Sequence, residues 1–191
     1  SDITYNLGHN DLATLIVILN EWVKAGESPL LVGNKDLCEF LRSHPELDAG
    51  VAVAHFMSFR GSNAFKNSSV VFVTGRNQPP IDEVEQQARA VFGGSGNPLS
   101  YDDKENLPLD QVDYWLSKRS PHSPAAMTVP SFCDPRVEAV QKQIREAETV
   151  QAIARLRLVW AKYQKRVFLL SNLPVEMPVD HLIEFNDLMP D

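Results

Sequence analysis

The sequence predicts an α/β fold with a mainly parallel β-sheet. Two observations indicate this class: amphipathic segments with helical spacing alternate with short apolar runs, and turn or capping residues separate the two kinds of segment. Such alternation is typical of βαβ units, whose strands are buried on both faces. The chain has 191 residues, 43% of them hydrophobic, which suits one domain with a sizeable core.

The N-terminal half contains three predicted helices and three predicted strands. Apolar residues recur at helical spacing over residues 10–25, and Gly26 can end this helix. The run "PLLVG" predicts a strand, and Asn34 can cap a second helix that Pro45 ends. "GVAVAHF" and "SSVVFVTG" predict two further strands, and "PPIDEVEQQARAVFGG" predicts a helix begun by prolines and ended by glycines.

The regular alternation stops at residue 94. Residues 94–131 are rich in Gly, Pro, Ser and Asp, and we interpret them as an insertion or lid-like loop region within a single domain of residues 1–191. Inside this region, "LDQVDYWLSK" predicts a short helix. "MTVPSF", at its end, predicts an edge strand.

The C-terminal part begins with the longest predicted helix. Asp134 can cap it and Pro135 suits its first position, and the pattern continues to about Tyr163. Apolar residues at helical spacing predict its buried stripe: Val137, Val140, Ile144, Ala147, Val150 and Ala154. "KRVFLLSNL" predicts a fourth strand, and "PVDHLIEFNDLM" predicts a short closing helix.

Composition narrows the possible functions. A net charge of -7 argues against a self-sufficient nucleic-acid binder, because such binding depends on Lys and Arg, although a local basic patch stays compatible. Cys38 and Cys133 form no CxxC pair, which argues against a disulfide framework or metal site and favours a cytoplasmic setting. The longest apolar run, "LATLIVIL", is too short to span a bilayer, so we expect no membrane partner.

Parallel α/β sheets bind ligands in the loops that follow the carboxyl ends of their strands. Here those loops are "GNK" after Val32, "HFMSFRGSNAFK" after Ala54 and "GRNQPP" after Thr74. One interpretation is therefore a Rossmann-like domain that binds a small phosphorylated ligand in the first and third loops.

A second candidate lies in the stretch "QAIARLRLV". On a helix, Glu148, Gln151 and Arg155 share one edge, whereas Arg157 lies about 200° round from Arg155. The planar guanidinium of Arg155 has the geometry to bind phosphate oxygens, so this edge of the helix can bind a phosphate group. A solvated face, with Glu148 paired to Arg145 or Arg155, is the alternative.

Three segments, taken in order, resemble the second (C-terminal) RecA-like domain of superfamily 2 helicases and translocases. They are "LLVGNKDLCEFL", "FRGSNAFKNSSVVFVTGR" and "ETVQAIARLRLVWAKYQKRVFLLS". The last resembles the Gln–x–x–Gly–Arg–x–x–Arg motif and its following strand, with Ala154 in place of the glycine and Leu158 in place of the final arginine. More narrowly, the combination resembles helicase-like regions of large phage- and plasmid-type proteins. The resemblance covers most of the chain outside residues 94–131 and implies a RecA-like three-layer fold, with a mainly parallel sheet and helices on both faces.

The resemblance also implies roles at the matching positions. Arg155 would be an arginine finger that reaches a nucleotide γ-phosphate, and Gln151 would lie near that phosphate or its attacking water. The other implied contacts are to nucleotide for Gly61, Asn63 and Arg157, and to a nucleic-acid backbone for Arg60 and Lys66. A plain turn glycine at Gly61 and a solvated lysine at Lys66 are the alternatives.

The sequence contains no GxxxxGK[ST] phosphate loop and no acidic metal-binding strand motif. We therefore expect ATP and Mg²⁺ to bind only together with an N-terminal RecA-like domain of the same protein, and DNA or RNA to be a further partner. Alone, the chain should not hydrolyse ATP. A degenerate RecA-like module, retained for protein or strand contacts without catalysis, is the alternative that Ala154 suggests.

Overall fold

The computed structural model describes residues 9–58, 65–75, 79–94, 96–101, 107–115, 126–154, 161, 163–171 and 177–190. The chain divides into two compact units. Unit 1 comprises Ser1–Arg76, Glu148–Ser171 and His181–Asp191, and unit 2 comprises Asn77–Ala147 and Asn172–Asp180. The prediction of one domain over residues 1–191 stays a prediction.

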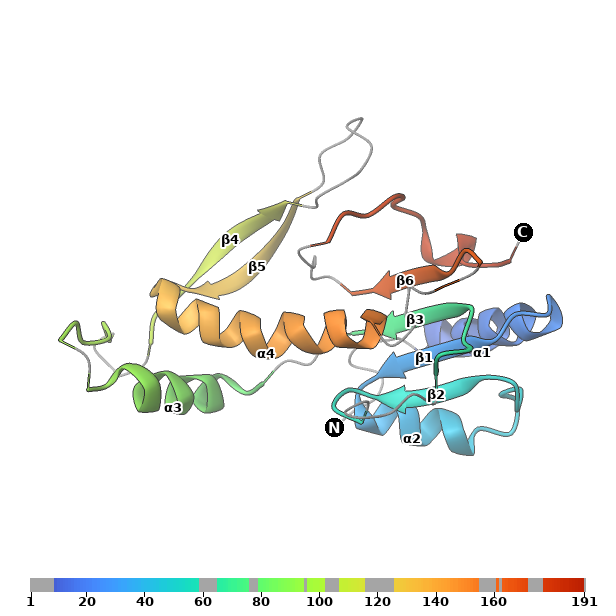
Figure 1. Ribbon diagram of the computed structural model, residues 1–191, viewed down its shortest axis with the longest axis horizontal. Coiled ribbons are helices and arrows are strands. Elements are labelled where there is room, and N and C mark those ends of the chain that lie inside the picture. Colours follow the sequence, from blue (N-terminus) through green and yellow to red (C-terminus); the bar gives the residue numbers. More distant parts are fainter. Residues whose placement is uncertain are drawn as a thin grey trace. The chain divides into compact units, whose positions relative to one another are not determined.

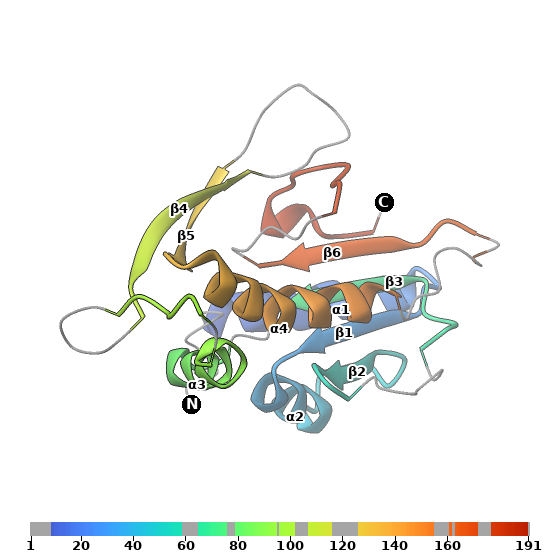
Figure 2. The same cartoon turned by 60° about the vertical axis from the view of Figure 1, so that its left-hand side comes forward.

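Unit 1 contains a four-stranded parallel sheet, and its arrows point the same way in both ribbon views (Figure 1, Figure 2). The strands are β1 (Pro29–Gly33), β2 (Ala52–His55), β3 (Val70–Thr74) and β6 (Arg166–Leu170), in the order β2-β1-β3-β6. This confirms the predicted α/β class, the parallel sheet and all four of its predicted strands. Because β2 and β3 lie on opposite sides of β1, the strand order reverses there, and such reversal points are where doubly wound sheets bind ligands.

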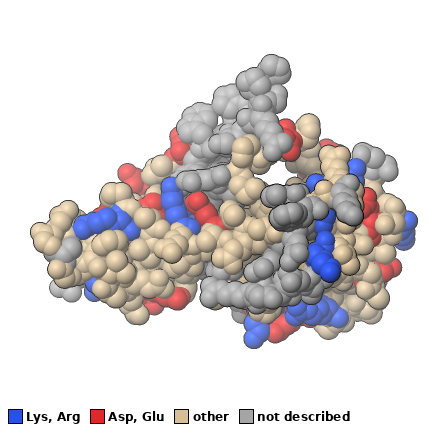
Figure 3. Space-filling view, viewed as in Figure 1, with Lys and Arg blue, Asp and Glu red and all other residues tan. Residues whose placement is uncertain are grey.

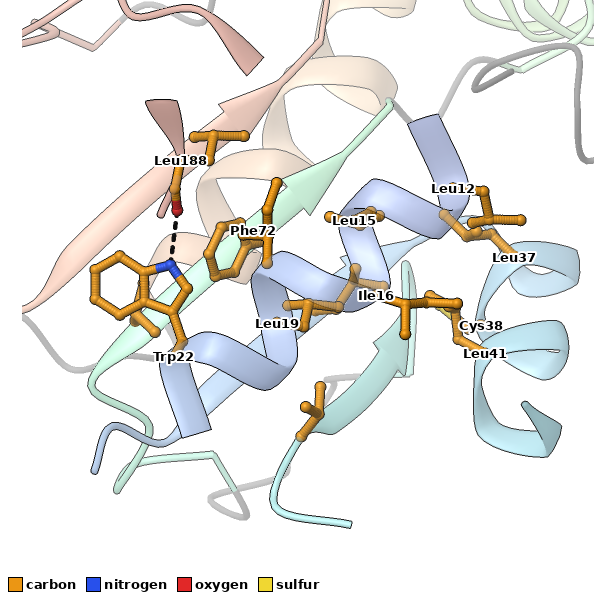
Figure 4. Packing of buried hydrophobic residues seen from close by; sticks show 14 residues of the cluster. Leu12, Leu15, Ile16, Leu19, Trp22, Leu37, Cys38, Leu41, Phe72 and Leu188 are labelled. Atoms are coloured by element: carbon orange, nitrogen blue, oxygen red, sulfur yellow. Dashed lines mark hydrogen bonds between the residues drawn. The ribbon is translucent and has the colours of Figure 1, made fainter. Parts of the chain in front are cut away.

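Two helices of unit 1 pack on one face of this sheet, as predicted from their apolar spacing. They are α1 (His9–Lys24) and α2 (Lys35–Ser43), and the side chain of Asn34 accepts a hydrogen bond from the amide of Leu37 at 2.8 Å to cap α2. Their leucines and isoleucines form one buried cluster with Leu31 of β1 and Phe72 of β3 (Figure 4). Each helix therefore gains its stability mainly by burying an apolar face against the sheet.

Trp22 ties the C-terminal segment to α1. Its indole N–H donates to the carbonyl of Leu188 at 2.7 Å, and its ring packs against Phe72 (Figure 4). The ring also packs against Phe168. The predicted closing helix is wrong: the described residues there contain only a 3₁₀-helix, Phe185–Asp187. The segment docks through Phe185 and Leu188 and leaves Leu182 67% exposed, so no amphipathic face is buried to hold a longer helix.

The opposite face of the sheet is buried as well. Leu30, Val32, Val71 and Val73 alternate with the residues of the first face and are all 1% exposed or less. This two-sided burial explains why the strands read as continuous apolar runs instead of alternating ones.

Unit 2 combines α3 (Ile81–Phe92) with an antiparallel hairpin of β4 (Leu109–Trp115) and β5 (Ala126–Phe132). The helix predicted over "LDQVDYWLSK" is wrong, because this segment is β4 and pairs with β5 from Leu109–Phe132 to Trp115–Ala126. Val112 lies opposite Val129, and such cross-strand contacts of β-branched residues override a weak helical pattern. The strand predicted at "MTVPSF" is confirmed as β5, but it pairs with β4 and not with the main sheet.

The long helix α4 (Pro135–Ala154) starts where the sequence predicts. The carboxylate of Asp134 accepts from the amide of Arg136 at 2.9 Å, and the guanidinium of Arg136 keeps the pKa of Asp134 low. The predicted apolar stripe is buried at Val137 and half-buried at Val140, Ile144 and Ala147, but it is wrong at its end, since Val150 is 41% exposed and Ala154 is exposed. Polar side chains are buried along this helix instead: Glu138, Gln141, Arg145 and Thr149. Within the described part of the chain, every helix is too short or too polar to cross a membrane.

Candidate functional site

Two of the seven predicted site residues are among those that the structure describes, Gln151 and Lys66. The other five lie outside the described residues: Arg60, Gly61, Asn63, Arg155 and Arg157. The structure therefore does not show whether these side chains meet, and their roles stay predictions.

Gln151 lies in the last described turn of α4 and is half-buried. Its neighbours Ala152 and Ile153 are buried, at 0% and 3% exposure, and all three residues belong to unit 1. The end of α4 is thus anchored by small and apolar side chains, and Gln151 lies at the border between the buried face and solvent. This is a suitable position for an amide that contacts a ligand, although an ordinary helix edge has the same character.

Lys66 lies in a turn, residues 65–67, that precedes β3, and its side chain is exposed. Its carbonyl oxygen accepts a hydrogen bond from the ammonium group of Lys165 at 2.8 Å. The backbone of Lys66 is therefore held while its side chain points to solvent. The location is compatible with the predicted phosphate contact and equally with a solvated lysine.

The carboxyl ends of β1, β2 and β3 form the edge of the sheet from which a ligand site is expected. Gly33 pairs with His55 across β1 and β2, and the amide of Phe56 donates to the carbonyl of Gly33 at 2.9 Å. A Cβ at Gly33 would come within 3.1 Å of the Cδ2 atom of Leu37, so a larger residue here would require the Leu37 side chain to shift by a few tenths of an ångström. The helix α2 then starts directly at this edge, with its N-terminal dipole end.

The turn after β2 is strained where it leads toward residues 59–64. Met57 has a φ of 68°, a left-handed conformation that costs a residue other than glycine about 1–2 kcal/mol. The hydroxyl of Ser58 donates to the carbonyl of His55 at 2.5 Å, which tightens this turn. Strained backbone tends to occur at functional sites, and here it lies two residues before the "FRGSN" segment of the resemblance.

Thr74, at the carboxyl end of β3, is a candidate site residue that the sequence did not indicate. Its side chain is 4% exposed, and its Oγ1 atom has no hydrogen-bond partner in the structure described. By strand alternation it shares the face of Phe72, on which α1 and α2 pack. Burying an unsatisfied hydroxyl costs about 1–3 kcal/mol, so a threonine here is not explained by stability. The only signal in the sequence is a single polar residue at the end of an apolar run.

Nucleophilic chemistry at Cys38 is disfavoured. This thiol is fully buried in α2 and donates to the carbonyl of Ala54 at 3.3 Å, and burial raises the pKa of Cys38 to about 11. At neutral pH it is a protonated, inert core residue. Among the described residues, no three His, Cys, Asp or Glu side chains gather in a way that would hold a metal ion.

Charge is distributed evenly over the surface that can be seen. Figure 3 shows Lys and Arg interspersed with Asp and Glu among the described residues of that face. Two local ion pairs among the described residues join Lys24 with Glu21 at 2.7 Å and Lys35 with Glu39 at 3.7 Å. A strong phosphate-binding surface needs an excess of cations, which the described residues drawn in Figure 3 do not show.

Known proteins supply no further assignment. A scan against protein-family models, a search of curated proteins and a search of solved structures each found no match to this chain.

Proposed function

We propose that unit 1 is the second RecA-like domain of a helicase-like protein that handles nucleic acid. One observation carries the proposal: the three segments of the resemblance, residues 30–41, 59–76 and 148–171, all belong to unit 1, whereas residues 94–131 belong to unit 2. These segments contain β1, β3 and β6, which are neighbours in one sheet of that unit.

The strand pairing supports the same assignment. β3 follows the "FRGSN" segment, β6 follows the "QAIARLR" segment, and these two strands are parallel neighbours from Val70–Arg166 to Thr74–Leu170. Segments separated by about ninety positions in the chain are thereby brought to adjoining strands. Both segments lead into the amino ends of these strands, so in the proposed fold they would serve a cleft with the partner domain at that edge and not at the carboxyl edge described above.

In this proposal, each predicted residue has one task. Arg155 stabilises negative charge on the transferring phosphoryl group, and Gln151 orients the γ-phosphate or the attacking water. Gly61, Asn63 and Arg157 complete the nucleotide contacts, while Arg60 and Lys66 hold a nucleic-acid backbone. Mg²⁺ and most of the nucleotide belong to the N-terminal partner domain, in keeping with the lack of a phosphate loop in this chain.

The test is the ATPase activity of the full-length protein that contains this chain. Arg155→Ala and Arg155→Lys should both lower kcat, by about 10³-fold for a functioning arginine finger, because lysine keeps the charge but not the planar fork. The matched control is Arg42→Ala, which removes an exposed guanidinium from α2 of the same unit and should leave kcat within about twofold. Normal turnover in both Arg155 variants would rule out the arginine finger.

A full-length protein that binds DNA or RNA but has no ATPase activity would instead support the degenerate module. A second candidate, binding of a small phosphorylated ligand at the carboxyl edge of β1 and β3, is favoured by the unsatisfied hydroxyl of Thr74 at the end of β3, the neighbour of β1 in the sheet. It is distinguished by thermal shift of the isolated chain against nucleotides and sugar phosphates. Stabilisation at micromolar ligand, lost in Thr74→Val, would support this candidate over the helicase-like one.

A further inference from the structure

The β4–β5 hairpin of unit 2 has two outer edges, and its hydrogen bonds show which residues face them. The amide of Cys133 donates to the carbonyl of Pro108 at 2.9 Å, and these two residues continue the register of the hairpin by one position. Hydrogen-bonded and non-hydrogen-bonded pairs alternate along antiparallel strands. The backbone groups of the even-numbered residues of β4 therefore point to β5, and those of Leu109, Gln111 and Asp113 point outward.

The outer edge of β5 is closed to a further strand. By the same alternation, Pro130 and Phe132 face outward on β5, and a proline has no amide hydrogen to donate. The outward amide of Phe132 donates to the carboxylate of Glu138 at 2.9 Å, so this amide is satisfied within unit 2. Proline residues and covering contacts are two means by which proteins prevent edge strands from pairing.

The outer edge of β4 has neither of these protections. Residues 109–113 are all exposed, Leu109 by 40% and Val112 by 42%, and β4 contains no proline. The outward amide of Gln111 donates to the carboxylate of Asp110 at 2.8 Å, a local contact that a strand partner can replace. Among the described residues the small sheet stops at β4, so this edge is open to a further strand.

We propose that β4 is a dimerisation strand, which pairs antiparallel with β4 of a second copy of this chain. Residues that exchange hydrogen bonds across the outer edge are both odd-numbered, so the two-fold axis passes through a residue. An axis at Val112 aligns all seven residues of both strands. Gln111 then lies opposite Asp113 of the second copy in a hydrogen-bonded pair. The two copies together form one sheet with the order β5-β4-β4-β5.

Side-chain chemistry favours this register with a strand of the same sequence. Val129 lies opposite Val112 in the hairpin and is 2% exposed, so the pairing extends one row of valines across all the strands of the joint sheet. Directly opposed β-branched residues stabilise antiparallel strands. Neither Asp110 nor Asp113 faces an aspartate, whereas an axis at Asp113 would place two like charges opposite each other. The proposal is independent of the helicase-like function.

The first test measures the mass of the 191-residue chain by light scattering over a range of concentrations. Gln111→Pro removes an outward amide that the β4–β5 pairing does not use, and Gln111→Ala is its matched control because it keeps this amide. Val112→Lys places two positive charges opposite each other in the proposed register. Circular dichroism of each variant checks that it remains folded.

We expect the wild type and Gln111→Ala to form a dimer. Gln111→Pro and Val112→Lys should each raise the dissociation constant about 10-fold or more, through lost hydrogen bonds and like-charge repulsion respectively. A wild-type chain that stays monomeric would overturn the proposal, and so would a folded Gln111→Pro variant that dimerises as tightly as Gln111→Ala.

Cysteine cross-linking tests the register itself. In a Cys133→Ser background, Val112→Cys brings two thiols directly opposite each other, whereas Asp110→Cys, on the same face of β4, leaves them offset along the strands. With oxidised glutathione as the oxidant, Val112→Cys should form a disulfide-linked dimer about 10-fold faster than Asp110→Cys. Equal rates, or no cross-link in either variant, would contradict the two-fold pairing at Val112.

Discussion

At the scale of single residues, burial decides which side chains can react with molecules in solution. Cys38 and Cys133 look equivalent in the sequence, but Cys38 is fully buried and Cys133 is exposed. No sequence pattern singles out Thr74 either, because an apolar run that ends in threonine is ordinary in a strand. Only packing shows that its hydroxyl is buried without a hydrogen bond in the structure described.

The two thiols should differ sharply in reactivity. With a disulfide-exchange reagent at pH 8, the native chain should titrate one thiol, Cys133, and the unfolded chain two. Burial raises the pKa of Cys38 from 9.0 to about 11, so at pH 8 its thiolate fraction is on the order of 10⁻³. Cys133→Ser should abolish the native signal, and a full thiol equivalent in that native variant would show that Cys38 is accessible.

The pH dependence of stability follows from the same pKa. Since the folded pKa of Cys38 lies above the unfolded value, the native state retains a proton that the unfolded state releases. The contribution of Cys38 to stability is therefore complete below pH 9 and declines as the pH rises from 9 toward 11. Urea unfolding of wild type and Cys38→Ala across this range measures the difference.

At the scale of elements, the helix starts that were predicted correctly depend on local contacts, and no distant contact opposes them. Asn34 caps α2 and Asp134 caps α4 through hydrogen bonds to amides two or three residues further along the chain. Such caps can be predicted from the local sequence alone. The failures are segments whose structure depends on a distant partner. Leu109–Trp115 became a strand because β5 was available to pair with it, and the C-terminal segment docks through Trp22 without forming the predicted helix.

The buried face of α4 was also predicted wrongly, although the ion pairs of its buried charge lie within the same helix. Arg145 is 1% exposed and contacts Glu138 at 3.5 Å, Glu146 at 3.2 Å and the side chain of Gln141 at 3.3 Å. Glu138 also accepts from the amide of Phe132 at 2.9 Å, which links the helix to the end of β5. A charged side chain normally predicts a solvated face, but ion pairs with Glu138 and Glu146 allow Arg145 to be buried.

This network yields a stability prediction. Arg145→Met should lower the free energy of unfolding by about 3 kcal/mol, because removing one partner leaves buried carboxylates without their counter-charge. Gln143→Met, at an exposed position of the same helix, should change it by less than about 0.5 kcal/mol. Urea denaturation followed by circular dichroism measures both. Equal stability of the two variants would mean that Arg145 contributes no net stabilisation.

At the scale of the whole molecule, the division into two units bears on how the chain unfolds. Each unit has its own core: one surrounds Leu19 and Phe72, the other includes Val84, Leu107 and Phe132. The boundary at residue 147 falls within α4 and the boundary at 76 falls directly after β3, so neither is marked by a linker in the sequence. Composition alone indicated only that residues 94–131 differ from their surroundings.

Matched core substitutions test whether the units are energetically separate. Leu19→Ala in unit 1 and Leu107→Ala in unit 2 should each cost about 2–5 kcal/mol, since both side chains are buried. We expect Leu107→Ala to speed hydrogen exchange in α3 and β5 more than in β1 and β3, and Leu19→Ala to do the opposite. Uniform acceleration by both variants would instead support one cooperative domain over residues 1–191.

The sequence by itself determined the α/β class, the four parallel strands, and the starts of α2 and α4. These follow from periodicity and from capping, which act between residues a few positions apart. Tertiary structure alone decided the strand order around β1, the β4–β5 hairpin, the burial of Arg145 and Thr74, and the contact between Lys165 and the carbonyl of Lys66. Each of these features depends on packing between segments that are distant in the chain, so the contacts that stabilise it form only when those segments come together. The resemblance named Lys66 as a candidate site residue, and the fold shows that Lys165 holds the carbonyl of Lys66.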